Sequence, residues 1–332
     1  MLNKAPKVSA VSNGRRLIRF AVFIIIGLLL ITAPQFIGTA FVSLVTKFFI
    51  FAILAMSLDI VFGYAGLWSF CHAAIFGVAG YTAGILAISL GITSFWLTAS
   101  AGILMAGVTA AIFGVIALRV SKLYFLIVTL ALGQLIYGIA LQWKSVTNGY
   151  DGLWNVPFPP DIGFSNTPLH YYYFTLIVAV ICTVLLYLIT RSPFGHSLEG
   201  IRDNEIRMRT LGYNTWLFKY IAFIIGGLFA GVAGIVYLHY NSVMNVYDVG
   251  IAASGMIMLM LIIGGAGRLW GAIFGSLVFV FLQFFVSLFT PARWPLIMGV
   301  VFILVAMFLR EGIWGYLNKL FKGGGNRGST TS

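Results

Sequence analysis

The chain has 332 residues, of which 61% are hydrophobic and only 8% are charged. A soluble globular domain carries about 25% charged residues, so the composition excludes a soluble protein of this size. The chain has twenty lysines and arginines and eight acidic residues, which gives a net charge of +12. These basic residues lie between long apolar runs, which favours the positive-inside pattern of membrane proteins over nucleic-acid binding. The composition predicts an all-α polytopic membrane protein.

A helix needs about 20 apolar residues to cross the hydrocarbon core. About ten segments qualify: 17–33, 41–62, 72–90, 95–118, 123–142, 171–190, 217–240, 251–267, 269–289 and 294–310. The first follows a basic stretch, but no convincing cleavage site comes after it, so we expect an uncleaved helix rather than a signal peptide. Segments 72–90 and 251–267 are short or rich in glycine and could be re-entrant.

The positions of the basic residues predict that both termini are cytoplasmic. Seventeen of the 20 lysines and arginines fall in the N-terminal region, the loops near 120, 191–219 and 268, and the C-terminal region. The predicted organisation is a basic cytoplasmic tail over 1–16, a transmembrane domain over 17–310 and a cytoplasmic tail over 311–332. The longest loop on the opposite side, 143–170, is rich in Pro, Asn, Gly and Asp. It is either a simple connection or a docking surface for an external partner.

A faint internal repeat appears in two glycine-rich stretches. Gly63-Tyr-Ala-Gly66-Leu-Trp68 precedes Ala74-Ile-Phe-Gly77, and Gly264-Gly-Ala-Gly267-Arg-Leu-Trp270 precedes Ala272-Ile-Phe-Gly275. The spacing differs between the two, so the signal is weak. It fits a fold of two related halves, as in many transporters.

The segment 192–213 differs from the rest of the chain because it combines charges of both signs with an apolar ridge. Leu198, Ile201, Met208 and Leu211 recur at helical spacing, and Gly212 is a suitable C-terminal stop. We expect one short amphipathic helix on the cytoplasmic face. A helix that lies on a bilayer favours Lys and Arg on its polar face, so the mixed charge favours a protein partner.

Two charged residues lie within one apolar segment. Lys47 and Asp59 are too far apart along a helix to pair, and we expect both to anchor the segment at the membrane interfaces. Cys71 and Cys182 show no metal-ligand spacing. The sequence contains no catalytic histidine motif and no nucleotide-binding GxxxxGK[ST] pattern, so we predict no enzyme activity, no metal and no cofactor bound by this chain.

Several blocks together resemble one transporter family, over roughly residues 50–310. They are Gly63–Gly66 with His72-Ala-Ala, Tyr124–Gly133, Thr147–Leu153, Ser192–Gly195 through Ile201–Glu205, Leu211-Gly212 and Gly264–Gly271. In order and spacing these blocks resemble the branched-chain amino acid permease family of ABC importers, in particular its M-type subunit.

The resemblance implies an importer in the bacterial inner membrane. Besides this chain it would contain a second permease of the H type, two ABC ATPases that bind ATP and Mg²⁺, and an external solute-binding protein. It identifies 192–213 as a coupling helix that seats on the ATPase. The coupling residues would be Glu199, Arg202, Asp203, Glu205 and Gly212. The loop 143–170, with Asn148 and Asp151, would dock the binding protein.

The solute path would run between this chain and the second permease, and the polar residues at membrane depth, Thr129 and Gln134, are its candidates. Branched-chain or similar small amino acids are the expected solutes, although relatives also carry urea, amides or other small organic solutes. The second hypothesis is a secondary carrier that works alone. The sequence shows no series of buried carboxylates of the kind that proton-coupled carriers use, which argues against this hypothesis. The mixed charge of segment 192–213 also argues against it.

Overall fold

The computed structural model describes residues 27, 30–32, 34–35, 38–120, 122–159, 161, 167–289, 294–308, 312–313 and 315. The first expected span, 17–33, and both expected tails lie almost entirely outside these residues. The described part is nearly all helical, as the composition predicted.

Seven helical segments of the described residues are long and apolar enough to cross a membrane. They are α2 (Thr39–Asp59) with the π-helical turn η1 (Ile60–Tyr64), α3 (His72–Ser89), α4 (Phe95–Ala117), α5 (Lys122–Gln142), α7 (Pro168–Arg191), α10 (Thr215–Asn241) and α12 (Leu269–Phe289). Two shorter helices, α11 (Ile251–Gly264) and α13 (Trp294–Phe308), also belong to the described bundle. Segment 72–90, which could have been broken or re-entrant, forms the continuous helix α3, which is long enough to cross a membrane. Segment 251–267 contains only the 14 helical residues of α11.

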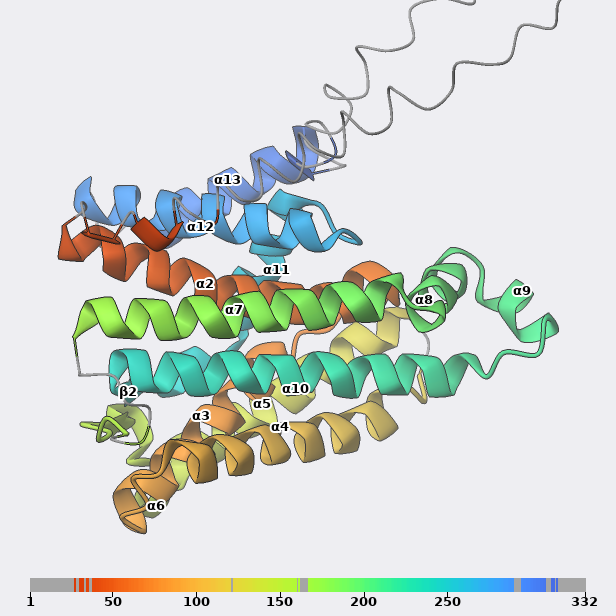
Figure 1. Ribbon diagram of the computed structural model, residues 1–332. Helices are drawn as coiled ribbons and strands as arrows, with labels where there is room; N and C mark the ends of the chain where they lie inside the picture. Colours follow the sequence, from red (N-terminus) through yellow and green to blue (C-terminus); the bar gives the residue numbers. More distant parts are fainter. Residues whose placement is uncertain are drawn as a thin grey trace, which may run out of the picture.

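The long helices lie side by side and run between two ends of the molecule (Figure 1). At one end α8 (Pro193–Asp203) and α9 (Glu205–Thr210) project beyond the bundle. The opposite end holds α6 (Lys144–Thr147), η2 (Gly149–Asp151), β1 (Leu153–Trp154), β2 (Val243–Met244) and η4 (Val246–Val249). β1 pairs with β2 in antiparallel register, with Leu153 opposite Met244 and Trp154 opposite Val243. This pairing places the loops after α5 and α10 on the same side.

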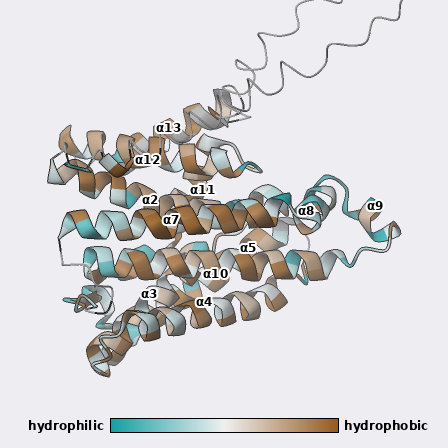
Figure 2. Cartoon of the chain, in the orientation of Figure 1, coloured by the Kyte–Doolittle hydropathy of each residue, from teal (hydrophilic) through white to brown (hydrophobic). Residues whose placement is uncertain are grey.

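Close helix contacts in the core depend on small residues, as is usual between helices in lipid. α2, α3 and α10 form the buried centre, with α4 packed on α3 and α10. A Cβ at Gly234 in α10 would overlap the Phe76 carbonyl of α3, and one at Gly227 would overlap the Ala110 side chain of α4. The outer faces of α4 and α7 carry exposed leucine, isoleucine and valine. Figure 2 shows that these apolar colours cover the middle of the bundle, whereas hydrophilic colours gather at its ends.

The two charges in α2 have different environments. Lys47 is exposed on the surface of the helix, and its role as an interfacial anchor stays a prediction. Asp59, the last residue of α2, is completely buried, so its expected role as an interfacial anchor is wrong. Sequence spacing placed Asp59 near the end of a span, but it could not show that α11 and α12 cover that end.

Candidate functional site

The segment 192–213 forms two helices rather than the single amphipathic helix expected from its periodicity. α8 ends at Asp203, and Asn204 adopts an extended backbone with φ −154° before α9 begins. The Asn204 side chain then accepts a hydrogen bond from the Arg207 backbone N–H at 3.0 Å and so caps α9. Local side-chain bonding of asparagine competes with helix continuation, and here it produces a bend within the segment.

α8 packs its apolar face onto the bundle. Leu198 and Ile201 are buried, as their spacing predicted. Gly195 lies so close to the Thr190 carbonyl of α7 that a Cβ there would overlap it. The opposite face carries Glu199, which pairs with His196 at 3.3 Å, and Asp203, which is exposed. α8 therefore presents its acidic residues away from the bundle.

α9 lies further from the bundle and exposes apolar side chains at its surface. The exposed fraction is 78% for Ile206 and 65% for Leu211. Leu211 therefore does not continue the buried ridge of Leu198 and Ile201. Charged Arg207 is also exposed on α9, and Gly212 takes a positive φ of 89° where the chain turns back toward α10. Exposed apolar residues among charges are typical of a protein docking surface.

Arg202 points toward the bundle rather than away from it. Its Nη1 donates to the carbonyl oxygen of Gly63, which lies in η1 at the end of α2. The same guanidinium lies against Gly267, in the loop between α11 and α12, because a Cβ at Gly267 would come 2.7 Å from Nη1. One side chain of α8 thus contacts both glycine-rich stretches that the sequence marked as a possible repeat.

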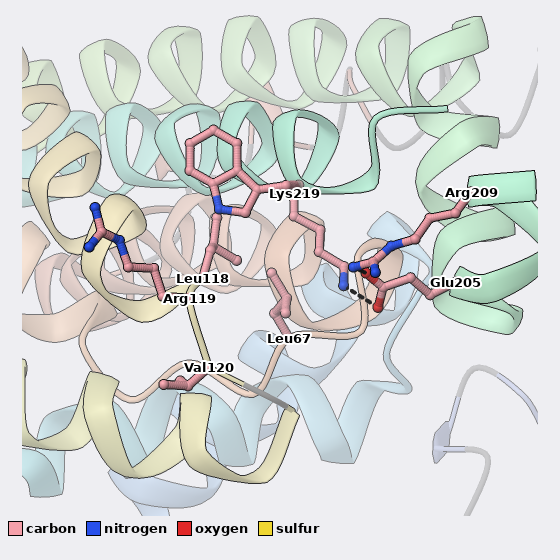
Figure 3. Close-up of a pocket in the computed structure, with 8 residues that line it drawn as sticks. Leu67, Leu118, Arg119, Val120, Glu205, Arg209 and Lys219 are labelled. Atoms are coloured by element: carbon pink, nitrogen blue, oxygen red, sulfur yellow. Dashed lines mark hydrogen bonds and ion pairs between the residues drawn. The ribbon is translucent and has the colours of Figure 1, made fainter. Parts of the chain in front are cut away.

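Glu205 also faces the bundle, where it ties α9 to α10. Its carboxylate accepts hydrogen bonds from Lys219 at 2.5 Å, from Arg209 at 2.9 Å and from the Thr215 hydroxyl at 3.1 Å. Lys219 is nearly buried, with a side-chain exposure of 10%. Figure 3 shows the Glu205–Lys219 pair beside a cavity of about 340 Å³. The cavity lies between α9, α10 and the end of α4 and is lined by Leu67, Leu118, Arg119, Val120, Glu205, Arg209, Trp216 and Lys219.

The ionisation of Glu205 follows from this network. Burial raises the pKa of its carboxyl, but the hydrogen bond and charge of Lys219, helped by Thr215 and Arg209, outweigh burial and lower the pKa from its ordinary value of 4.5. A group whose pKa falls on folding stabilises the fold above its unfolded pKa. That stabilisation is lost as the pH falls through the lowered pKa.

Glu205→Gln is expected to destabilise the protein at pH 7 by about 2–3 kcal/mol, because it leaves the Lys219 ammonium nearly buried without a carboxylate. Thermal unfolding of the wild type and the variant measures this gap. The gap should shrink as the pH is lowered below 4.5, the ordinary pKa of the group. Glu199→Gln is the matched control, since its exposed pair with His196 is expected to contribute little. A gap that is constant over this pH range would contradict the assignment.

The two glycine-rich stretches meet at the same end of the bundle, although more than 190 residues separate them. The Gly267 backbone N–H donates to Asp59 Oδ1 at 2.7 Å. Gly63 lies between these groups, and a Cβ there would overlap both the Asp59 carboxylate and the Gly267 backbone. The stretches are also similar in layout, since each lies between two apolar helices, α2 and α3 or α11 and α12.

The candidate path residues lie on α5. Thr129 is fully buried, and its hydroxyl accepts from the Phe70 backbone N–H at 3.2 Å and donates to the Leu126 carbonyl at 3.0 Å. Gln134 is half-buried. Only 22% of the best apolar stretch of Tyr124–Gln142 is buried within this chain. α5 therefore leaves most of its surface for lipid or for another subunit.

The candidate docking residues lie at the opposite end from α8 and α9. Asn148 and Asp151 are both exposed, and Asn148 adopts a left-handed backbone with φ 59°. The large side chains of Tyr150 and Trp154 beside them are also exposed. The structure brings the coupling residues Arg202 and Glu205 close to the bundle, whereas the path and docking residues remain separate from them.

Sequence reasoning missed Asp59 and Lys219 as partners of the coupling segment. Both lie in apolar helices, where periodicity gives no indication of long-range partners. The cost of burying a charge in a membrane segment was a usable signal for Asp59. A second signal was the glycine-rich stretch that begins at Gly63, four residues after Asp59, because a similar stretch recurs at Gly264.

Residues 40–306 match the family model described as "Branched-chain amino acid transport system / permease component". The permease protein LivM of Escherichia coli K12, from a high-affinity branched-chain amino acid transport system, is 27% identical over 271 residues, which cover 74% of this chain and 64% of LivM. The chain thus spans slightly less than two thirds of the length of this relative.

The LivH permease protein of the same organism and transport system is 24% identical over 285 residues, 80% of this chain and 91% of LivH. A solved structure, "PsaBC from Streptococcus pneumoniae in complex with Fab", aligns with 88% of this chain and 98% of its own at 16% identity and a TM-score of 0.45. The family match extends over most of the chain and includes both glycine-rich stretches and the α8–α9 segment. The chain therefore belongs to the family of permease components of branched-chain amino acid transport systems.

Proposed function

We propose that this chain is one permease subunit of an ATP-driven importer for branched-chain or similar small amino acids. Membership of the permease family supports this proposal. Two ATPases that bind ATP and Mg²⁺ would supply the energy, and this chain would carry out no catalysis. The partners would be a second permease of the H type and an external binding protein, in the inner membrane of a bacterium.

The observation that carries the proposal is the exposed surface of α8 and α9. Ile206 and Leu211 are large apolar residues at the tip of a segment that projects from the bundle beside charged Asp203 and Arg207. Exposing this apolar area costs free energy unless a partner covers it. An ATPase groove at the cytoplasmic membrane surface fits these residues, so we place α8 and α9 in the cytoplasm.

The same orientation agrees with the rest of the proposed topology. It places both termini in the cytoplasm, and the proposed bundle has about ten spans in two related halves. The β1–β2 end would then face outward. Asn148 and Asp151, together with the exposed Tyr150 and Trp154, would form a polar and aromatic surface of the kind that binds proteins.

The solute path would lie along α5, where the second permease would cover the surface left free by this chain. Gln134 is the better placed of the two path residues, because the Thr129 hydroxyl is already bonded to backbone groups of this chain. A neutral amide can hydrogen-bond either end of an amino acid. It would suit urea or a small amide equally well, which keeps those solutes as the alternative substrates.

Ile206→Asp is expected to release the ATPase, because it places a charge at the centre of the proposed contact. The tagged chain is purified in mild detergent from cells that contain the whole importer, and the ATPase retained is quantified. We expect at least a tenfold loss with unchanged thermal stability, since Ile206 is 78% exposed. Thr210→Ala, on the same short helix, is the control; its hydroxyl donates to the Arg207 carbonyl within α9.

Two outcomes would contradict the proposal. Equal retention of the ATPase by Ile206→Asp and the wild type would remove α9 from the contact. Uptake of leucine by liposomes that contain this chain alone, without any ATPase, would favour the second hypothesis of a carrier that works by itself.

A further inference from the structure

The end of α2 contains a buried charge that the proposed function does not use. Asp59 has no exposed surface. Its Oδ1 accepts the Gly267 N–H, but its Oδ2 is buried without a hydrogen bond from any described residue. A buried carboxylate needs compensation by an opposite charge or by several hydrogen bonds. The backbone N–H groups of the α11–α12 loop supply only part of it.

The compensating charge comes from the coupling segment. Arg202 is the cationic side chain that reaches the same two glycines as Asp59, since it donates to the Gly63 carbonyl and lies against Gly267. The two side chains are separated by a thin layer of backbone, because Gly63 and Gly267 each touch both of them. Arg202 also packs on Gly66, where a Cβ would come 2.9 Å from its Cγ. Only glycine at these positions lets the guanidinium approach so closely.

This arrangement has a mechanical consequence. If α8 moved away from the bundle by itself, Asp59 would be left buried without its cation, and the Gly63 carbonyl would lose its donor. Both losses are unfavourable in a medium without water. A displacement of α8 is therefore opposed unless the η1 turn and the α11–α12 loop move with it. A simple surface contact between α8 and the bundle would not impose this condition.

We propose that Arg202 and Asp59 form the tie through which the coupling segment moves both glycine-rich loops together. This inference rests on the proposed function, since it assumes that an ATPase displaces α8. Arg202 is then a positioning residue that faces the membrane domain, while Glu199, Asp203 and the α9 tip face the ATPase. Asp59 is its counterpart in α2, and Gly63 and Gly267 allow the two side chains to act on each other.

The test uses the complete importer in proteoliposomes, with leucine uptake and ATP hydrolysis measured on the same sample. The variants are Arg202→Gln, Asp59→Asn, their combination, and Arg202→Lys. We expect each single neutral variant to retain the bound ATPase and to hydrolyse ATP within about twofold of the wild-type rate. The number of leucine molecules moved per ATP should fall at least tenfold.

Two comparisons separate a tie from simple structural support. The double variant should couple no worse than either single variant, because removing both charges leaves no buried charge uncompensated. Arg202→Lys keeps the charge and should recover part of the coupling, even where Arg202→Gln folds poorly. Arg191→Gln is the control, since it neutralises an exposed arginine at the end of α7, whose guanidinium lies over the Tyr187 ring at 5.4 Å and which takes no part in the proposed tie. Its ratio of transport to hydrolysis should equal that of the wild type.

Other results would overturn the inference. If transport and hydrolysis fall in parallel in the single variants, with an unchanged ratio, then Arg202 and Asp59 only support the fold. If the double variant is worse by the product of the two single effects, the residues act independently. If the wild-type chain retains no ATPase, the proposed function itself fails and this inference fails with it, so the two failures are distinguishable.

Discussion

Replacing Gly264 by alanine is expected to prevent the proper packing of α11 on α12 and to leave little folded protein. The added methyl group would overlap the Gly271 carbonyl and come 3.0 Å from the Gly275 backbone nitrogen. These neighbours are backbone atoms, which cannot rotate away as a side chain could. The two helices would have to separate, at a cost of about 3 kcal/mol or more. The yield of monodisperse protein and its thermal unfolding midpoint in detergent measure the effect.

Gly255→Ala is the matched control, because Gly255 lies on the same helix and a Cβ there would meet nothing within 4 Å. Alanine is the better helix former, so this variant should be as stable as the wild type or more stable by about 0.5–1 kcal/mol. Normal yield and an unchanged midpoint for Gly264→Ala would show that α11 and α12 are not packed backbone to backbone.

Gly63→Ala is expected to abolish transport by separating the glycine-rich loops. The methyl group would occupy space held by the Asp59 carboxylate and the Gly267 backbone. The 2.7 Å hydrogen bond between them would break, which would leave a buried carboxylate without its donor. We expect a loss of about 3 kcal/mol in stability and, if the proposed function holds, more than a tenfold loss in leucine uptake by the proposed importer.

Gly255→Ala again provides the comparison, since Gly255 lies within α11 and an added Cβ would have no neighbour within 4 Å. Uptake and unfolding are measured on both variants in the same preparation. A Gly63→Ala importer with normal uptake would mean that the space between Asp59 and Gly267 is not needed, and the account of this site would have to be abandoned.

The positions of the seven long helices were predictable from the sequence because each depends on local composition. Whether a run of apolar residues is long enough to cross a bilayer can be judged from the run itself, without knowledge of the neighbouring helices. The ends of α4, α5 and α10 consequently lie within a few residues of the sequence expectation. α7 begins at Pro168, close to the expected start at 171, because proline favours the first turn of a helix.

The candidate site was only partly predictable, because its partners are distant along the chain. The segment 192–213 was recognisable by its mixed charge, but its bend depends on one side chain, Asn204. The direction in which Arg202 points depends on Gly63 and Gly267, from two other parts of the sequence. The repeat was visible in the sequence as two similar glycine-rich stretches. The contact between these stretches around Asp59 is a property of the tertiary structure.

The π-helical turn η1 also constrains how this chain can change in length. Ala65 donates to the Ile60 carbonyl at 3.1 Å, five residues back, so the turn holds one residue more than an α-helix would. Leu67 donates to the Val61 carbonyl at 2.9 Å rather than to the Gly63 carbonyl, which accepts from Arg202 instead. Deleting one residue of the turn would favour the regular α-helical pattern, in which each N–H donates to the carbonyl four residues back. Such a deletion should therefore take the Gly63 carbonyl away from Arg202.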